Sequence, residues 1–234
     1  MNRIPKIIHQ VWSGIDEPLP KHFKTLGESW KSDYPEWEYV VWDNQKMNDF
    51  IQSNYPEYWE LYQAFPYNVQ RWDVIRYLIL DKIGGMYVDF DYQSLARMDS
   101  LLENRTCCFS EEENYINKKG ENVSVFNNAL MLSVPKHPFM QKIIETAFSD
   151  KMVYANPEPK QQCVLSTTGP GMITTLYNSL SSEEKGNVYI IPAKYVTPFS
   201  VLQARFVRQG YNGPEVKKAL EEAYAVHYFW GGWL

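Results

Sequence analysis

The sequence lacks both glycine-rich phosphate cradles that nucleotide-binding proteins commonly use, since neither GxGxxG nor GxxxxGK[ST] occurs in its 234 residues. It also lacks a run of about 18 apolar residues, which a membrane-spanning helix would require. Its opening residues, MNRIPKIIHQVW, do not have the apolar core of a signal peptide. We therefore expect a cytoplasmic protein, with peripheral association at the inner face of the plasma membrane as an open alternative. Any diphosphate it binds must be neutralised by something other than a backbone cradle.

Cysteine is scarce and basic charge is not in excess. The three cysteines, Cys107, Cys108 and Cys163, match no zinc-binding spacing, so we expect buried free thiols in a reducing compartment. The net charge of −5 argues against a nucleic-acid partner, because nucleic-acid-binding domains usually carry a basic face. No internal repeat, low-complexity tract or linker divides the chain, so we expect residues 1–234 to form a single domain.

Aromatic residues are abundant, with 8 Trp, 17 Tyr and 11 Phe. Such rings fill protein cores, and they also stack on sugars and nucleobases. Most of them are expected to pack in the core, but the composition is compatible with a carbohydrate ligand.

Short apolar segments alternate with helical patterns along the chain. Strands are expected at 4–12, 37–42, 86–92, 106–110, 129–134, 188–192 and 225–229. One helix is expected at 20–33, and a second begins after a cap at Asp43 or Asn44. Further helices are expected at 55–64, 68–82, 136–149, 169–180 and 214–223. This alternation predicts an α/β fold with a mainly parallel central sheet flanked by helices. Ligands of such sheets bind beyond the carboxyl ends of the strands.

The strongest local signal is GGMYVDFD, residues 84–91. If this segment is an extended strand, Asp89 and Asp91 point to the same face, roughly 6.5 Å apart at the backbone. Two neighbouring carboxylates repel each other unless a cation lies between them. Mn²⁺ and Mg²⁺ accept carboxylate oxygens and keep sites open for phosphate and water. We therefore expect Asp89 and Asp91 to anchor Mn²⁺ or Mg²⁺, which would bridge to a diphosphate; the alternative is an ordinary solvent-facing pair.

Asp73 and Arg76 lie one helix earlier and are three residues apart, so they share a helix face. One interpretation is a surface ion pair worth under about 1 kcal/mol. The other places Asp73 on sugar hydroxyls and Arg76 near a sugar donor.

The stretch RWDVIRYLILDKIGGMYVDFDYQSL, residues 71–95, resembles the DxD region of the sugar transferases known as glycosyltransferase family 32. Asp73, Arg76, Tyr87, Asp89 and Asp91 fall on motif positions of that family, whereas Trp72 stands where the family usually has Ser. The segments IPKIIHQVWSG, SWKSDYPEWEYVVWD and HYFWGGWL are also similar to family segments, as are Asn127-Asn128-Ala129 and Thr168-Gly169-Pro170-Gly171. The resemblance therefore covers most of the chain.

The resemblance implies a GT-A-type nucleotide-diphospho-sugar transferase fold and a retaining, metal-dependent glycosyltransferase. It implies catalytic roles for Asp73, Arg76, Asp89 and Asp91, and donor contacts from Trp12, Asp73, Arg76, Tyr87, Asp89 and Trp230. In this interpretation Trp12 stacks on the base of the nucleotide. His227 either completes the metal site with Asp89 and Asp91 or has a structural role. Trp230 and Trp233 either close over the donor or pack in the core.

The favoured donor is a UDP-hexose such as UDP-galactose or UDP-glucose, used in capsular or exopolysaccharide synthesis. The acceptor would be a saccharide, possibly lipid-linked, at the membrane face. The alternative is a GDP-mannose-dependent mannosyltransferase. Two other classes stay open: a non-catalytic carbohydrate-binding protein, and a metal-dependent phosphohydrolase or nucleotidyltransferase that draws on Glu111, Glu112 and Glu113. Arg205 and Arg208 either contact anionic lipid or acceptor phosphate, or lie on a solvated helix or loop face.

Overall fold

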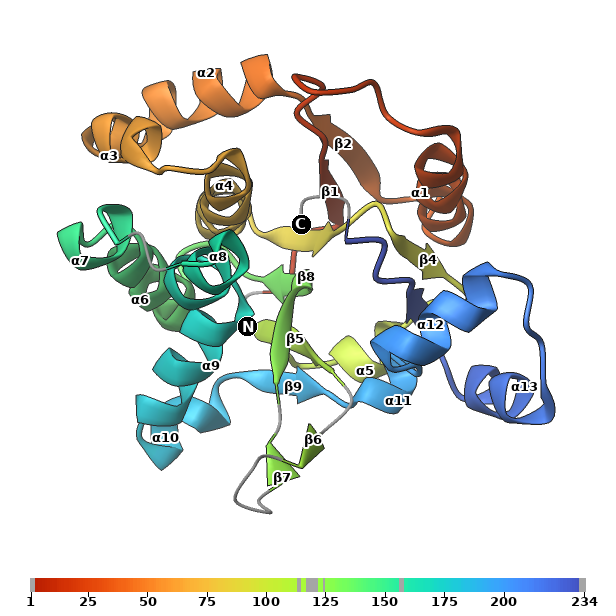
Figure 1. Cartoon of the computed structure of the whole chain (residues 1–234). Helices are drawn as coiled ribbons and strands as arrows, with labels where there is room; N and C mark the ends of the chain where they lie inside the picture. The colour runs from red at the N-terminus through yellow and green to blue at the C-terminus, as the bar shows by residue number, and fades with distance from the viewer. Residues whose placement is uncertain (1–2, 113–114, 117–121, 124, 156–157, 232–234) are drawn as a thin grey trace.

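The computed structural model describes residues 3–112, 115–116, 122–123, 125–155 and 158–231. A six-stranded sheet runs through its centre (Figure 1). The strand order is β2 (Glu38–Trp42), β1 (Ile7–Val11), β3 (Gly85–Val88), β8 (Phe126–Ser133), β5 (Cys107–Glu111) and β9 (Tyr189–Ile191). Every neighbouring pair is parallel except the two pairs that include β8. The predicted mainly parallel sheet is therefore confirmed, with β8 as its antiparallel member.

Helices cover both faces of the sheet (Figure 1). One face carries α2 (Asn44–Asn54), α3 (Trp59–Ala64), α4 (Asn68–Lys82), α6 (Pro138–Ala147), α7 (Asp150–Val153), α8 (Lys160–Thr167) and α9 (Pro170–Ser179). The other face carries α1 (Lys21–Asp33), α5 (Asp99–Leu102) and α11 (Ala193–Val196). Each face has its own apolar core: Ile75 of α4 belongs to one, and Trp30 of α1 belongs to the other.

The remaining elements lie at the ends of these layers. The 3₁₀ turn η1 (Pro56–Tyr58) precedes α3, and α10 (Ser182–Gly186) precedes β9. Two small antiparallel sheets pair β4 (Tyr92–Ser94) with β10 (Ala225–His227) and β6 (Tyr115–Ile116) with β7 (Asn122–Val123). The helices α12 (Val201–Arg208) and α13 (Pro214–Glu221) pack on each other and on β10 through a third apolar cluster.

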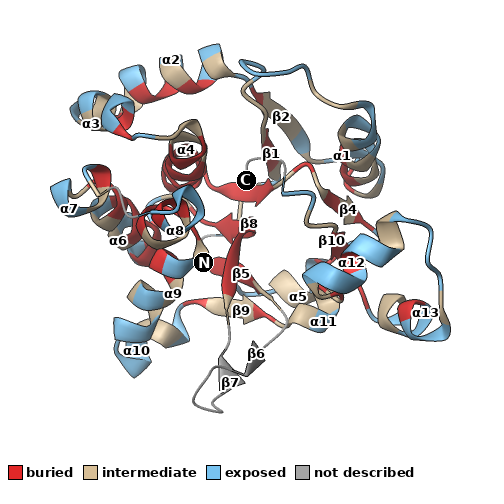
Figure 2. Cartoon of the chain, in the orientation of Figure 1, coloured by how far each residue is buried: buried red, intermediate tan, exposed pale blue. Residues whose placement is uncertain are grey.

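Helix α4 occupies the predicted range 68–82 and is buried on almost every side, since 11 of its 15 residues are buried. Figure 2 shows it among the most buried helices of the fold. A helix with so little exposed surface must pair its charged side chains internally, because an unpaired buried charge is costly. Three of its buried residues are charged, namely Asp73, Arg76 and Asp81.

The glycines after α4 make the tight connection to β3. Gly84 and Gly85 have φ values of +75° and +104°, a region that favours glycine. A Cβ atom on Gly85 would lie 2.6 Å from the carbonyl oxygen of Ile7. The close approach of β3 to β1 therefore requires glycine here, and it fixes where the segment after β3 emerges.

Several smaller expectations are confirmed. Asp43 caps α2, and its side chain accepts a hydrogen bond from the Lys46 N–H at 2.8 Å. Cys107, Cys108 and Cys163 are buried free thiols. Within the part of the chain that the structure describes, no helix has both the length and the apolar character needed to cross a bilayer.

Candidate active site

The carboxyl ends of β2, β1 and β3 meet at one edge of the sheet, because the three strands are parallel. Trp12 follows β1 there, and Asp89 follows β3. The loops after β1 and β2 lie side by side: the Trp12 N–H donates to the Trp42 carbonyl at 2.9 Å, and the Asn44 N–H donates to the Ser13 carbonyl at 3.1 Å. Ligands of parallel sheets bind at this edge.

Asp89 and Asp91 lie in a turn, not on one continuous strand. Strand β3 ends at Val88, the Tyr92 N–H donates to the Asp89 carbonyl at 3.1 Å, and the chain then enters β4 of a separate sheet. The expected strand over 86–92 is therefore wrong, because the chain leaves the six-stranded sheet halfway through it. The two carboxylates still affect each other: burial raises the pKa of Asp89, and the charge of Asp91 adds to this rise.

Arg76 lies between two carboxylates. Its Nη2 is 3.1 Å from Asp73 Oδ1, and its Nη1 is 3.3 Å from Asp89 Oδ1. The guanidinium also lies 4.8 Å over the ring of Tyr87, whose hydroxyl donates to Asp89 Oδ1. The side chains of Asp73 and Arg76 are only 6% and 8% exposed, so the alternative of a surface ion pair is wrong.

Asp73 has two further polar partners from outside α4. Asn128 of β8 donates through Nδ2 to Asp73 Oδ1 at 3.0 Å, and the hydroxyl of Thr168 donates to Oδ2 at 2.8 Å. Arg76 also donates through Nη1 to the Asn128 carbonyl at 3.0 Å. Burial raises the pKa of Asp73, and Arg76, Thr168 and Asn128 act against this rise. Both oxygens of Asp73 are thus engaged within the protein, so its predicted contact with sugar hydroxyls stays a prediction.

The C-terminal segment closes onto Asp91. The Nε2 of His227 lies 3.3 Å from Asp91 Oδ1, and the Trp230 backbone N–H donates to Asp91 Oδ2 at 3.0 Å. The His227 ring lies between the rings of Tyr92 and Phe229, with centroid distances of 4.4 and 3.9 Å. Burial acts to lower the pKa of His227, but the Asp91 charge outweighs it, so the pKa lies above its usual value. His227 thus lies beside Asp91, and its role as a metal ligand stays a prediction.

The donor atoms near this turn suit a divalent cation, since carboxylate oxygens suit Mg²⁺ and Mn²⁺ and neutral imidazole is a common metal ligand. Asp89 is 30% exposed, and its Oδ2 takes part in none of the contacts that the structure describes for this residue. Across the described ranges, however, no three His, Cys, Asp or Glu side chains converge closely enough to hold a metal ion. Asp91 and His227 are paired, whereas Asp89 Oδ1 is engaged by Arg76 and Tyr87.

Aromatic side chains line one side of the turn. The Trp12 ring centroid lies 6.2 Å from that of Phe90, which is the residue between Asp89 and Asp91 in the sequence. It lies 5.5 Å from the ring centroid of Phe23. Trp230 lies 6.0 Å from Phe23 and 4.3 Å from His22. Trp230 is 41% exposed, so core packing does not explain its position. The stacking of Trp12 on a base stays a prediction, and Trp233 lies outside the described residues.

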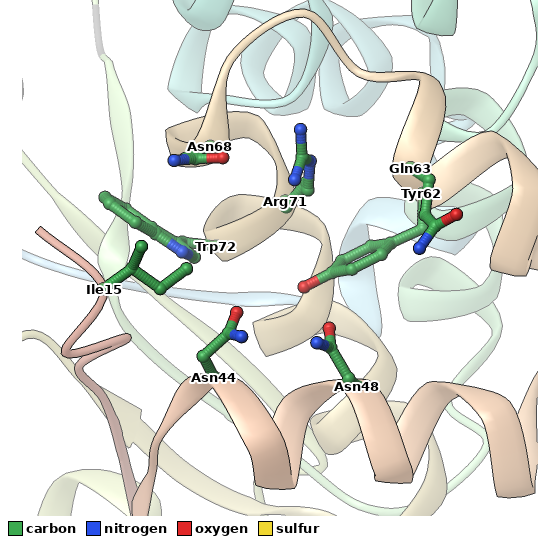
Figure 3. Close-up of a pocket in the computed structure, with 8 residues that line it drawn as sticks. All are labelled: Ile15, Asn44, Asn48, Tyr62, Gln63, Asn68, Arg71 and Trp72. Atoms are coloured by element: carbon green, nitrogen blue, oxygen red, sulfur yellow. The ribbon is translucent and has the colours of Figure 1, made fainter.

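A polar cavity of about 130 Å³ opens between α2 and α4 (Figure 3). Figure 3 shows Asn44 and Asn48 pointing from α2 toward α4, which carries Arg71 and Trp72. Gln63 and Asn68 complete the polar lining. The buried Nε of Arg71 has no hydrogen-bond partner among the residues that the structure describes. The cavity therefore offers amide groups, one cationic group and an indole at the ligand-binding edge of the sheet.

The chain is similar in sequence to known proteins. A family model described as "Glycosyltransferase sugar-binding region containing DXD motif" matches residues 20–107. Inositol phosphoceramide mannosyltransferase 2 of Schizosaccharomyces pombe is 34% identical over 174 residues, which are 74% of this chain and 46% of that protein. Residues 20–107 thus match the sugar-binding region of DXD-containing glycosyltransferases. Mannosyl phosphorylinositol ceramide synthase CSH1 of Saccharomyces cerevisiae is 29% identical over 197 residues, or 82% of this chain and 48% of that protein.

Two solved structures share the fold of this chain. The PaToxG glycosyltransferase superimposes with a TM-score of 0.53 at 15% identity, covering 93% of this chain and 79% of that one. The ligand-free glycosyltransferase domain from the YGT toxin superimposes with a TM-score of 0.53 at 11% identity, covering 82% of this chain and 80% of that one. The expected GT-A-type fold is confirmed. The chain spans about half the length of the curated relatives it matches, and its organisation as one domain stays a prediction.

The match to the DXD-containing glycosyltransferase model and the names of the relatives support a sugar transferase over the two rival classes of the sequence analysis. Of the glutamates that the phosphohydrolase hypothesis invoked, Glu113 lies outside the described residues. Glu111 accepts a hydrogen bond from the Ala193 N–H at 3.4 Å. Burial raises the pKa of Glu112, and the charge of the nearby His227 acts against this rise. Glu112 thus interacts electrostatically with His227, although the resemblance gave it no role.

Proposed function

We propose that this chain is a metal-dependent mannosyltransferase that transfers mannose from GDP-mannose to a lipid bearing an inositol phosphate head group. The observation that carries the proposal is the 34% identity over 174 residues to a protein named for mannosyl transfer to inositol phosphoceramide. Two Saccharomyces cerevisiae relatives are likewise named mannosyl phosphorylinositol ceramide synthases. The sequence favoured a UDP-hexose and capsular synthesis, whereas the names of the relatives support the alternative, mannosyl transfer.

The polar cavity suits the base of such a donor. Guanine presents O6 and N7 as acceptors, which a guanidinium can pair, and an indole offers a face for stacking. Arg71 and Trp72 both line this cavity, and Trp72 stands where the family usually has Ser. The amides of Asn44, Asn48 and Asn68 could pair with the remaining polar edge of the base. We place the guanine there, so that Trp72 takes the stacking role that the resemblance gave to Trp12, which does not line this cavity.

The buried ion pair suits the sugar-diphosphate part of the donor. Arg76 is oriented by Asp73 and Asn128, so its positive charge is preorganised beside Asp89 and costs little to align during the reaction. Asp73 is itself oriented by Thr168. We therefore assign Arg76 to the donor and Asp73 to positioning Arg76, in addition to its predicted contact with the sugar.

A divalent cation, Mn²⁺ or Mg²⁺, is the proposed cofactor. Asp89 Oδ2, Asp91 and His227 would hold it only after moving closer together, because these described side chains do not converge in this structure and Asp91 is paired with His227. The side chain of Asp89 has the exposure that such a role needs. Bound there, the cation would neutralise the diphosphate and stabilise negative charge on the leaving nucleotide. The proton on His227 must leave before its Nε2 can act as a ligand, because a metal binds only neutral imidazole.

We further propose transfer with retention of configuration, by a route in which the leaving phosphate assists the acceptor. The bond between the anomeric carbon and the phosphate oxygen breaks on the sugar face where the acceptor oxygen attacks, and the hydroxyl proton passes to the leaving phosphate. Catalysis on such a route is mostly positioning and charge stabilisation. Those are the roles for which the buried Arg76 network is built.

The deciding experiment is a donor panel of GDP-mannose, UDP-glucose and UDP-galactose with Mn²⁺ and an inositol phosphoceramide acceptor. Release of nucleoside diphosphate and the mass of the lipid product are both measured. We expect GDP release from GDP-mannose, and a lipid product heavier by one hexosyl residue. Transfer from a UDP-sugar with none from GDP-mannose would return the function to the UDP-hexose hypothesis. Absence of nucleotide release from every donor would contradict a transferase role for this chain.

A further inference from the structure

Helix α12 presents large apolar side chains to solvent. Val201, Leu202 and Phe206 are 59%, 60% and 48% exposed. Successive helical residues are about 100° apart, so these three side chains and Arg205 share one outward sector, while Ala204 is buried on the opposite side. Figure 2 shows α12 as an exposed helix on the outside of the fold. A cluster of exposed large apolar groups marks a surface that contacts something else.

The charged residues of α12 itself are both basic. Arg205 lies among the apolar side chains, and Arg208 lies at the end of the helix. Helix α12 contains no acidic residue. Glu215 of α13 lines a hollow with Phe206, and its carboxylate accepts a hydrogen bond from the Tyr211 hydroxyl at 2.6 Å. Apolar side chains interleaved with cationic ones complement an anionic lipid surface, because the chains enter the head-group region while the cations pair with phosphates.

We propose that α12 docks this glycosyltransferase onto an anionic lipid surface. Val201, Leu202 and Phe206 enter the head-group region, and Arg205 contacts lipid phosphates. This inference rests on the proposed function in one respect, namely that the acceptor is a lipid whose head group lies at such a surface.

The docking helix is joined to the candidate active site through Arg208. Its Nη1 donates to the Phe229 carbonyl at 3.1 Å, and its guanidinium lies 4.8 Å over the Trp230 indole. Trp230 in turn donates through its backbone N–H to Asp91 Oδ2. A lipid surface that contacts α12 therefore lies close to the segment that closes onto the acidic turn. A lipid head group is the part of the acceptor that this placement would present to the site.

The test is co-sedimentation of the full chain, without donor, with vesicles of phosphatidylcholine alone or mixed with phosphatidylinositol. We expect binding to the phosphatidylinositol vesicles to be at least about tenfold tighter, because each arginine near an anionic surface adds to affinity. The double variant Leu202→Glu with Phe206→Glu should lose at least about tenfold, and Arg205→Gln should lose most of the preference for anionic vesicles. Tyr154→Glu is the matched control: Tyr154 is 66% exposed and follows α7, on the other side of the fold from α12 (Figure 1).

Three results would overturn the inference: wild-type protein that stays in the supernatant with both kinds of vesicle, a double variant that binds as the wild type does, or equal losses in Tyr154→Glu. The first would leave a protein partner as the occupant of α12.

Nucleotide release in detergent micelles of the lipid acceptor separates this inference from the proposed function. We expect the double variant to keep wild-type turnover in micelles. Loss of turnover in all proteins, with vesicle binding intact, would contradict only the proposed function.

Discussion

His227 lies 3.3 Å from Asp91, and the Trp230 backbone N–H holds the other oxygen of the same carboxylate. A short C-terminal segment thus closes onto a turn that lies 139 residues earlier in the chain. Burial acts to raise the pKa of Asp91, but the His227 charge and the Trp230 N–H outweigh it, so the pKa lies below its usual value. Asp91 is therefore held in its ionised form, with both oxygens engaged by the C-terminal segment.

Asp91→Asn should lower turnover at least about 100-fold, because it removes a proposed metal ligand and the charge that pairs with His227. Asp99→Asn is the control, since Asp99 pairs with the exposed Arg97 away from the site. Turnover is measured by nucleoside diphosphate release, and folding by circular dichroism. A chelator should stop the wild-type enzyme, and added Mn²⁺ should restore it. Near-normal turnover of Asp91→Asn, or full activity in chelator, would remove the metal from the proposal.

Arg76→Lys should keep the fold and lower kcat/KM at least about 100-fold. A lysine keeps the charge, but a single ammonium cannot reach Asp73, Asp89 and the Asn128 carbonyl together as the planar guanidinium does. The control is Arg97→Lys, which changes an exposed arginine and should leave kcat/KM unchanged. If Arg76→Lys retained wild-type kcat/KM, the planar geometry of the guanidinium would have no part in donor binding.

Thr168→Val should lower the free energy of unfolding by about 1–3 kcal/mol, because it leaves Asp73 Oδ2 buried without its hydrogen bond. Loss of this bond also loosens the Asp73–Arg76 pair, so kcat/KM should fall about tenfold. Thr168→Ser keeps the hydroxyl and serves as the rescue variant. The free energy is measured by urea unfolding. Equal behaviour of the valine and serine variants would show that the hydroxyl does not position Asp73.

Features set by neighbouring residues could be predicted from the sequence. The range of α4 followed from the helical spacing of its apolar residues and from the glycines that stop it. The cap at Asp43 followed from the short polar side chain before a helical pattern. The strand expected over 86–92 was wrong because its end is set by residues that are far away in the sequence. Its alternating pattern suits a strand, but the change from one sheet to another after Val88 is decided by the pairing of β4 with β10.

The candidate site was predicted only in part. Motif positions identified Asp73, Arg76 and the acidic pair, but spacing showed neither the depth at which Asp73 is buried nor its partners. A buried carboxylate requires donors, and these come from Asn128 and Thr168, which are far away in sequence. Only the rival phosphohydrolase hypothesis drew on Glu112, as one of three adjacent glutamates. Such an acidic run usually lies in solvent. No local pattern indicates that Glu112 lies near His227.

Gly85→Ala should lower the free energy of unfolding by at least about 2 kcal/mol. Its φ of +104° strains any side chain, and the new Cβ would lie 2.6 Å from the Ile7 carbonyl oxygen. Gly186→Ala is the matched control, because a Cβ there meets no atom within 4 Å. Thermal unfolding of the two variants measures the difference. Equal melting temperatures would show that β3 can move away from β1 without cost.

His9 should make the fold sensitive to acid. Its ring is buried, with Nε2 2.9 Å from the Gly84 carbonyl and Nδ1 accepting from the Trp42 indole N–H at 3.2 Å. Burial lowers the pKa of His9 to about 4, and the hydrogen bond to Gly84 acts against this fall. As the pH falls below about 6.5, the unfolded chain binds a proton on this histidine that the folded chain does not bind. The free energy of unfolding should therefore decrease between about pH 6.5 and pH 4.

The His9→Gln variant isolates this effect. Other groups also titrate in this range, but they contribute equally to both proteins, so the comparison reports on His9 alone. We expect the wild type to lose about 2 kcal/mol more than His9→Gln between about pH 7 and pH 5, as measured by urea unfolding at each pH. The variant should start less stable, because a glutamine cannot satisfy Gly84 and Trp42 with the same geometry. Parallel losses in the two proteins would mean that His9 is protonated equally in the folded and unfolded chain, which its burial beside Gly84 argues against.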